Sequence, residues 1–551
     1  MGNSKDAASV EHGTKTEPVE VAVDVESSQT DPDPPGQYLT GLRLHLVTAA
    51  LCMCLFLTNL EIPIVVTSIV SITSDIGGQG KVYWIIASYM IGYVGVLVIS
   101  AKFSDIFGRK SCLLAAVLIF IVFSGACGGS QTIEQLIVFR AFQGVGGAGN
   151  YSLCAAVVLE LVPPERYASY TSGMSVVYAI SLLLGPIFGG AISESAWRWV
   201  FLLNVPPAAL AGLVLILALP NRFPRHNQPK NASRFSLHQS LTDAFRKVDL
   251  LGSCLLLIAT VCLVAPLEEA NREFAWRSAF TIVMLVISGL AWIVFLLWER
   301  RVTLSSGPTE PVFPWRFVQN RVWMGMLLNS ICLGGTWFVA IFQLPQRFQF
   351  VNGLSPLQAG IRLIPFTVAA PVGSVLAPVL AKIFKLPLVY LVLVASLIQV
   401  VAYALLGTLS ESIHMAAAQY GYQVLAGFGC GINITLLILM TPFTVEQQDK
   451  AVAMGAVAQF RVMGGAICLA IVTAASQGYL QSHLAHLLDS QQVHEILNST
   501  DALGEFSEAT QEAIRVTYSG SYNLQMKILI AFAGGQVLST ALMWKRKQLT
   551  V

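Results

Sequence analysis

The sequence has few charged residues. Asp, Glu, Lys and Arg make up 12% of its 551 residues, whereas hydrophobic residues make up 55%. Soluble domains carry about 25% charged residues, so a soluble fold could not cover this much apolar surface. The formal net charge of +2 is too small to indicate a nucleic-acid partner. The composition therefore predicts a protein that has membrane lipids as its surroundings.

Several kinds of chemical site are also missing. The ten cysteines are scattered singly, without the spacing of a metal site or a disulfide framework. The eight histidines fall in expected tails, loops or span edges, so no His–carboxylate site for a membrane-embedded enzyme is indicated. No Gly-rich loop ends in Gly-Lys-Ser/Thr, which excludes a P-loop ATP motor. We expect no metal, no cofactor and no enzyme activity, and a proton or other ion gradient as the energy source.

Apolar stretches dominate what is present. A membrane-spanning helix needs about 20 such residues, and fourteen stretches qualify, which predicts an all-α polytopic membrane protein. They lie at 44–70, 83–101, 112–129, 135–161, 168–193, 199–219, 250–267, 278–298, 323–345, 357–380, 386–408, 416–441, 451–475 and 524–544.

Lys and Arg gather in alternate connections, and this asymmetry predicts that both chain ends are cytosolic. The stretch 1–40 is polar, acidic and Pro-containing, as in a disordered tail. The spans divide as six, two and six. The expected parts are six spans in 41–220, a cytosolic loop in 221–249, two linker spans in 250–298, a second cytosolic loop in 299–320, six spans in 321–544 and a tail in 545–551. An extracellular loop at 476–523 contains a glycosylation sequon at Asn498.

A short charged run, "KFSDIFGRK" at 102–110, separates the second and third spans. We expect Asp105 at the start of the third helix, where the helix dipole favours an anion. Gly108 would allow the chain to turn sharply. The simpler interpretation is an ordinary cytosolic loop with positive charge.

Charged residues also occur within the spans. An unpaired Arg in the bilayer costs roughly 2.5–3.5 kcal/mol, so Arg140 of span four needs a partner, and Glu61 of span one is the most natural. Glu61 could instead have a purely structural role. Arg461 lies about 15 Å into span thirteen and would neutralise a substrate anion or pair with a carboxylate. The polar residues proposed to line a substrate cavity are Gln143, Gln343, Asn433, Gln459 and Arg461.

Several stretches resemble those of one transporter family. "AKFSDIFGRKSCLL" is similar to the cytosolic loop signature of the major facilitator superfamily, which implies a conformational latch formed by Asp105, Gly108, Arg109 and Lys110. "LTNLEIPIVV" and "RAFQGVGGAGN" resemble two further family stretches, which implies proton coupling by Glu61 and Arg140. "SLLLGPIFGG" is similar to the antiporter motif, which implies a hinge at Gly185, Pro186, Gly189 and Gly190. Helix packing alone is the other explanation for these glycines.

Three more stretches narrow the resemblance. "WRWVFLLNVPPAAL", "GLSPLQAGIRLIP" and "AMGAVAQFRVMGGAICLAI" look like fungal members of the fourteen-span drug–proton antiporter group. The resemblance implies two six-helix bundles with two extra central helices. It also implies export of a small, mostly apolar toxin, secondary metabolite or drug by proton antiport with alternating access. A monomer in the plasma membrane is expected, with the vacuolar membrane as the alternative location. The alternative functions are an uptake symporter for a siderophore, sugar or basic amino acid, and a non-transporting sensor.

Overall fold

The computed structural model describes residues 38–77, 81–221, 223, 246–269, 275–305, 307–489, 491–493, 496, 506–546 and 548–550. Across these residues the regular structure is helical, apart from one isolated bridge between Val248 and Glu310. Thirteen helices of the described chain are long and apolar enough to cross a membrane. The all-α polytopic fold expected from the sequence is therefore confirmed.

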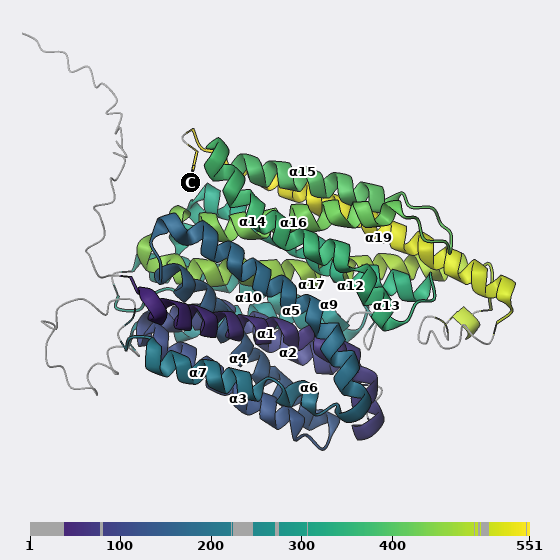
Figure 1. The fold of residues 1–551 in the computed structure, drawn as a ribbon, viewed down its shortest axis with the longest axis horizontal. Coiled ribbons are helices and arrows are strands. Elements are labelled where there is room, and N and C mark those ends of the chain that lie inside the picture. Colours follow the sequence, from purple (N-terminus) through teal and green to yellow (C-terminus); the bar gives the residue numbers. More distant parts are fainter. Residues whose placement is uncertain are drawn as a thin grey trace, which may run out of the picture. The chain divides into compact units, whose positions relative to one another are not determined.

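One group of helices comes from the N-terminal half of the described chain (Figure 1). The long helices of this group pack in the pairs α1–α5, α2–α4, α3–α4 and α1–α7. We call this group the N-terminal bundle. Its helices are α1 (Gly41–Ile76), α2 (Val82–Phe107), α3 (Arg109–Gly128), α4 (Ile133–Glu160), α5 (Tyr167–Ala196), α6 (Trp199–Leu202) and α7 (Val205–Ala218).

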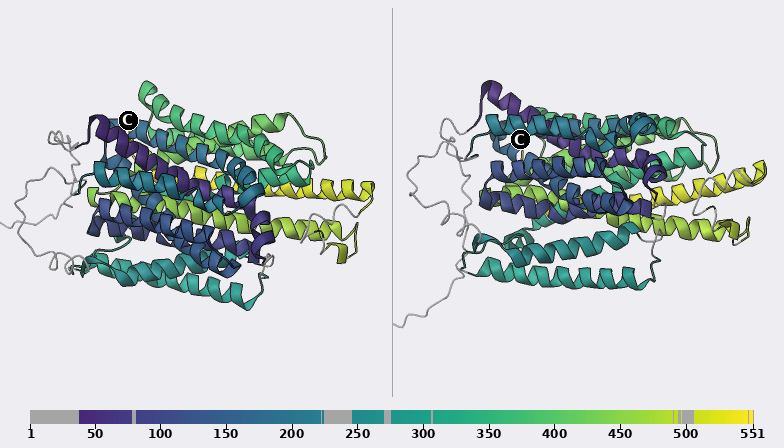
Figure 2. Two further views of the ribbon diagram at one scale, coloured as in Figure 1. Left: turned by 60° about the horizontal axis from the view of Figure 1, so that its bottom comes forward. Right: turned by 90° about the horizontal axis from the view of Figure 1, so that it is seen from below.

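A second group, the C-terminal bundle, packs in the pairs α12–α17, α12–α19, α14–α16 and α15–α19. The linker helices α9 (Leu250–Glu269) and α10 (Ala279–Leu304) lie between the two groups in sequence. They pack side by side (Figure 2), and α9 contacts α2 and α17. The remaining helices are α11 (Trp315–Gln319), α12 (Arg321–Phe350), α13 (Pro356–Arg362), α14 (Ile364–Phe384), α15 (Leu388–Gly407), α16 (Ala418–Thr444), α17 (Lys450–Leu484) and α19 (Glu508–Met543).

Helix α4 is the fourteenth long helix, although it is too polar to count among the thirteen apolar spans. It packs against α1, α2 and α3, and most of its residues are buried. Its glycines permit this packing: a Cβ atom added at Gly144 or Gly146 would collide with the backbone of α2 or α3. Helix α4 is polar because it faces other helices rather than lipid.

The segment at 476–523, predicted to be an extracellular loop, is helical at both of its ends. Helix α17 continues to Leu484 and α19 already starts at Glu508, so both helices run past their neighbours (Figure 1). Apolar side chains join the extensions, including Leu480, Leu484 and Ile514. This apolar contact explains why the helices continue beyond the expected spans. The predicted glycosylation site, Asn498, lies outside the described residues.

Candidate functional site

The carboxylate of Glu61 and the guanidinium of Arg140 form an ion pair within the N-terminal bundle. The distance from Arg140 Nη1 to Glu61 Oε1 is 2.5 Å, and neither side chain is exposed. Asn204 donates its amide hydrogen to the other carboxylate oxygen of Glu61, over 2.5 Å. Arg140 also donates to Gln143 Oε1 at 2.9 Å. The contact expected between spans one and four is therefore present, and each charge has a partner, as burial in a medium of low dielectric requires.

Two further contacts fix the guanidinium of Arg140. Its Nε donates to the backbone carbonyl of Ile85 at 3.0 Å. Its central carbon lies 4.4 Å from the ring centroid of Tyr89, which is a cation–π geometry. Its Nη2 has no hydrogen-bond partner among the described residues. Arg140 thus joins α1, α2 and α4, and a change in the charge of Glu61 would act on all three helices.

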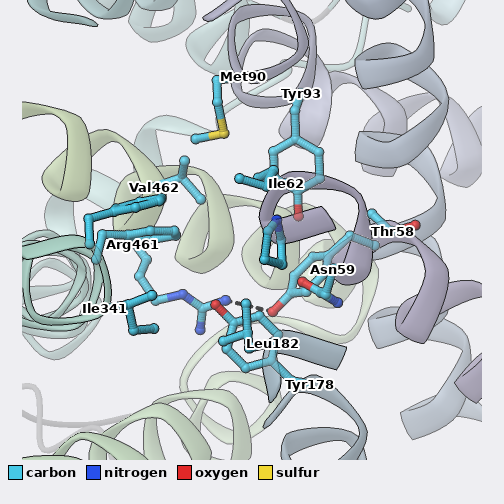
Figure 3. A pocket seen from close by; sticks show the side chains of 14 residues that line it. Thr58, Asn59, Ile62, Met90, Tyr93, Tyr178, Leu182, Ile341, Arg461 and Val462 are labelled. Carbon is cyan, nitrogen blue, oxygen red and sulfur yellow. Dashed lines mark hydrogen bonds between the residues drawn. The ribbon is translucent and has the colours of Figure 1, made fainter. Parts of the chain in front are cut away.

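A cavity lies between the two bundles. It has a volume of about 60 Å³, far below the roughly 300–1,000 Å³ of sites for drug-sized ligands. Figure 3 shows the side chain of Arg461 reaching into its centre, with Tyr93, Thr58 and Asn59 opposite. The remaining wall is mainly apolar and aromatic: Ile62, Pro63, Met90, Tyr151, Tyr178, Leu182, Phe338, Ile341, Phe342 and Val462. The cavity must widen before an organic molecule can bind there.

A row of tyrosines connects the cavity with the buried ion pair. Tyr93 lines the cavity and stacks on Tyr89, with 6.0 Å between ring centroids. The ring of Tyr89 in turn makes the cation–π contact with the guanidinium of Arg140. On the other side, the rings of Tyr93 and Tyr151 pack edge to face, with 6.2 Å between their centroids. The Tyr151 hydroxyl accepts a hydrogen bond from Arg461 at 2.6 Å. The two intramembrane arginines are therefore linked by contacting rings across the bundle interface.

The bundles contact each other on the side that the sequence predicts to be cytosolic. Val98 of α2 donates its backbone N–H to Gln459 of α17 at 3.2 Å. The hydroxyls of Ser175 and Thr435 are 2.9 Å apart, which joins α5 to α16. The indole of Trp337 donates to the Tyr178 hydroxyl at 2.9 Å, nearer the middle of the helices. These contacts join the bundles on the predicted cytosolic side of the cavity and near its middle.

Most of the residues predicted to contact substrate lie elsewhere in this conformation. A second, smaller cavity of about 20 Å³ also lies between the bundles, lined by Tyr178 and Ile434 among others. Arg461 lines these two cavities, whereas Gln143, Gln343, Asn433 and Gln459 line neither. Gln143 bonds to Arg140 and Ser124, and Gln459 bonds to α2. Asn433 donates to Gln536 and Ser396 inside the C-terminal bundle. Amides have partners within the helix packing that sequence position alone does not reveal.

The structure corrects the expected placement of the charged run at 102–110. Asp105 lies in the last turns of α2, not at the start of α3, and the chain turns at Gly108 with φ +97°, a conformation that favours glycine. Because the C-terminal end of a helix disfavours an anion, the carboxylate needs a cation, and Arg109 lies 2.6 Å from it. Arg109 also pairs with Glu160 of α4 at 2.9 Å.

The remaining cations of this run also contact residues outside the C-terminal bundle. Lys110 donates to the carbonyl oxygens of Ile216 and Leu219 at the end of α7. Lys102 pairs with Glu310, in the segment after α10, at 2.9 Å. The ion pairs and hydrogen bonds of Lys102, Arg109 and Lys110 described here thus lie within the N-terminal bundle or reach the linker segment. The predicted latch between the bundles stays a prediction.

The predicted hinge at "GPIFGG" is a site of close helix packing. A Cβ atom at Gly185 would lie 2.5 Å from the Pro63 ring, and one at Gly189 would collide with Thr67 and Ile64. A Cβ at Gly190 would meet nothing within 4 Å. Helix α5 runs unbroken from Tyr167 to Ala196 with Pro186 inside it. Two glycines of the motif therefore hold α5 against α1 next to Glu61, and bending at this point is not required by the structure.

An acidic cluster at the ends of the linker helices was missed from the sequence. Glu299 of α10 is fully buried, and its Oε2 accepts the backbone N–H of Phe313 at 3.1 Å. Asp249 is also buried and accepts from the indole of Trp298 at 2.9 Å. A Cβ at Gly252 would meet carboxylate oxygens of both residues, so these oxygens lie close together. The pattern "WER" at the end of span eight was the only sequence feature that indicated a buried acid there, and it is equally typical of an exposed helix end.

The nearby Glu310 is partly exposed and lies outside the spans. Burial raises the pKa of its carboxyl, but the hydrogen bond and the charge of Lys102, together with Lys247, outweigh that effect and lower the pKa below its ordinary value. Glu310 is therefore ionised at neutral pH and ties the linker segment to α2 through Lys102.

Comparison with known proteins identifies the family. Residues 49–267 and 270–468 match the model of the Major Facilitator Superfamily. The chain is 39% identical over 547 residues to the MFS-type transporter FPY5 of Fusarium mangiferae, covering 98% of this chain and 90% of the relative. It is 26% identical over 514 residues to efflux pump bfoC of Aspergillus brasiliensis, covering 92% of this chain and 88% of that protein.

A solved structure shares the fold. The inward-facing, unoccupied structure of a bacterial homologue of the human lysosomal transporter Spinster has a TM-score of 0.58, with 16% sequence identity. The match covers 92% of this chain and 100% of that chain. The helices, the family match and this likeness agree, and the chain belongs to the Major Facilitator Superfamily of secondary transporters.

Proposed function

We propose that this transporter exports small, mostly apolar organic compounds in exchange for protons. Relatives that cover most of the chain carry the names MFS-type transporter and efflux pump, and "GPIFGG" resembles the antiporter motif. Together with α4, the thirteen apolar spans make fourteen long helices in the described chain, which supports placement in the fourteen-span drug–proton antiporter branch. We further propose a monomer in the plasma membrane, with a proton gradient as the energy source and no cofactor.

The observation that carries this proposal is the buried pair of Glu61 and Arg140, joined to the cavity by Tyr89 and Tyr93. Protonation of Glu61 would remove the counter-charge of Arg140. An uncompensated guanidinium in a dry bundle is costly, so α1, α2 and α4 would rearrange toward another partner. One proton would thereby favour one access state of the transporter over the other.

The cavity provides the second half of the exchange. In this conformation the contacts of α2 with α17 and of α5 with α16 join the bundles on the predicted cytosolic side of the cavity. Substrate entering from the cytosol requires these contacts to open and the cavity to widen. Glu61 lies one helical turn or less from the cavity-lining residues Thr58, Ile62 and Pro63 of the same helix. Substrate binding and proton binding would therefore act on the same segment of α1.

The test is Glu61→Gln in proteoliposomes that contain the purified full-length chain and an imposed pH gradient. The matched control is Glu134→Gln, which removes an exposed carboxylate from α4 where it pairs with Lys81. We expect Glu61→Gln to abolish substrate movement driven by the pH gradient, and Glu134→Gln to retain it. Unchanged efflux and pH dependence in Glu61→Gln would refute the coupling role. Substrate accumulation with the proton gradient, rather than against it, would indicate the uptake symporter instead.

A further inference from the structure

The cavity between the bundles contains one cation that no protein carboxylate neutralises. Arg461 is 5% exposed, and none of the ion pairs among the described residues includes it. Its Nη2 donates to Tyr151, whereas Nε and Nη1 make no hydrogen bond with a described residue. No Asp or Glu occurs among the residues that line either cavity. This arrangement contrasts with Arg140, whose charge Glu61 balances.

We infer that Arg461 binds the acidic group of the substrate, so that the transported compounds are organic monoanions with an apolar or aromatic body. The acidic group would be a carboxylate or an ionised enol or phenol, since each presents a delocalised oxyanion to a guanidinium. This inference rests on the proposed function, because it names the chemical class that the exporter carries.

The surroundings of Arg461 support an anion over a neutral or cationic ligand. A buried guanidinium is stable only with an acceptor for its charge, and the tyrosine hydroxyls nearby offer only partial compensation. The Tyr178 hydroxyl accepts the indole N–H of Trp337, so its own proton is available for an oxyanion. A cationic ligand would meet like charge in a site without a carboxylate. The wall formed by Phe338, Phe342 and Ile62 fits an apolar body.

The position of Arg461 also suits release as well as binding. Arg461 belongs to α17 of the C-terminal bundle, while its partner Tyr151 belongs to α4 of the N-terminal bundle. A ligand oxyanion on Nε and Nη1 would leave the bond to Tyr151 in place and add a second tie between the bundles. Separation of the bundles would remove Tyr151 and the opposite wall from the ligand together.

The experiment measures equilibrium binding of two probes with one body, 2-naphthoate and 2-naphthamide, to the full-length chain in nanodiscs at pH 7 without a pH gradient. We expect naphthoate to bind at least about tenfold more tightly than the amide, as for a hydrogen bond to a charged group. Arg461→Gln should reduce this ratio to about one. The matched control Arg347→Gln removes another buried arginine of the C-terminal bundle, held by Asn523 and Ser519 away from both cavities, and should leave the ratio unchanged.

Three results would overturn the inference. The first is a ratio of naphthoate to naphthamide affinity near one in the unmodified chain. The second is that neither probe binds. The third is an affinity ratio that stays unchanged in Arg461→Gln. Tyr151→Phe serves if Arg461→Gln does not fold, because it frees the guanidinium without removing it and should keep the preference for naphthoate. Loss of the preference in Tyr151→Phe would count against the inference. Binding without proton-driven flux would refute only the proposed exchange, whereas flux without anion preference would refute only the substrate class.

Discussion

Removing the charge of Glu61 should destabilise the protein more than removing the charges of Glu61 and Arg140 together. In Glu61→Gln, the Arg140 guanidinium stays fully buried and keeps only neutral acceptors, Gln143 and the Ile85 carbonyl. Breaking a buried pair on one side costs about 3–5 kcal/mol. With an unfolding entropy of about 2 cal/mol/K per residue over roughly 500 residues, 4 kcal/mol lowers the unfolding midpoint by about 4 °C.

The double variant Glu61→Gln/Arg140→Gln leaves two neutral amides beside Asn204 and Gln143. We expect it to cost at most about 2 kcal/mol. Since Glu61→Gln and Arg140→Gln should each cost about 3–5 kcal/mol, the coupling energy should be at least about 4 kcal/mol in magnitude. Thermal unfolding of the four proteins in one detergent, followed by a thiol-reactive dye, measures the cycle. The exposed pair of Lys81 and Glu134 is the reference cycle, with an expected coupling of about 0–1 kcal/mol. Additive effects of Glu61→Gln and Arg140→Gln would refute the claim that the two charges depend on each other.

Three further perturbations follow from the structure. The folded state lowers the pKa of Glu310. Its ionised form therefore contributes stability that is fully present above the ordinary pKa of 4.5 and is lost as the pH falls through the lower folded-state pKa. Glu310→Gln should lower the unfolding midpoint more at pH 7 than at pH 4, and an equal effect at both pH values would contradict the assignment. Gly189→Leu should sharply reduce the monodisperse fraction of the protein in size-exclusion chromatography. Gly190→Leu should not, because a Cβ at Gly190 meets nothing within 4 Å. Equal monodisperse fractions in the two variants would contradict the α1–α5 packing. A Cβ added at Gly455 would lie 3.1 Å from the Leu97 carbonyl across the bundle interface. Gly455→Val should therefore separate the bundles on the predicted cytosolic side. It should also increase the rate of thiol labelling of a cysteine introduced at Ser172. Unchanged labelling would place the opening elsewhere.

The sequence predicted the spans well because a membrane-spanning helix requires a long, continuous apolar stretch, which can be recognised directly in the sequence. It even included α4, whose glycines and polar residues lower its hydropathy, because Arg140 and Gln143 stand among apolar neighbours. Helix ends were predicted less well. Phe107 ends α2 six residues beyond the expected span, and α17 continues nine residues past its expected end, since the chain keeps its helical hydrogen bonds wherever packing continues outside the apolar core.

The partner of a buried polar group could be predicted from the sequence only where a buried charge required an opposite charge and one candidate stood out. Glu61 was the obvious counter-charge for Arg140, and the two residues meet. Neutral amides carry no such constraint. Asn433 and Gln459 looked equally suited to a cavity, yet each makes hydrogen bonds in helix contacts, while Asn433 Oδ1 and Gln459 Nε2 are buried without a partner among the described residues. The cluster of Asp249 and Glu299 was missed because each acid stands at a span end, where sequence alone indicates exposure to water.

The two bundles solve the burial of polar groups with different chemistry. In the C-terminal bundle, Gln536 donates to Thr336 and Gln399, and Asn433 donates to Gln536, all without exposure to solvent. Amides and hydroxyls of this kind keep their hydrogen bonds at any physiological pH, so this network cannot respond to a proton. The corresponding polar centre of the N-terminal bundle is an ion pair, and one of its members is a carboxylate. In the proposed mechanism the proton acts first on the N-terminal bundle, and its effect must cross the interface to alter access. The tyrosine row ends at Arg461, so contacting side chains join the proposed proton site to the proposed anion site across the bundle interface.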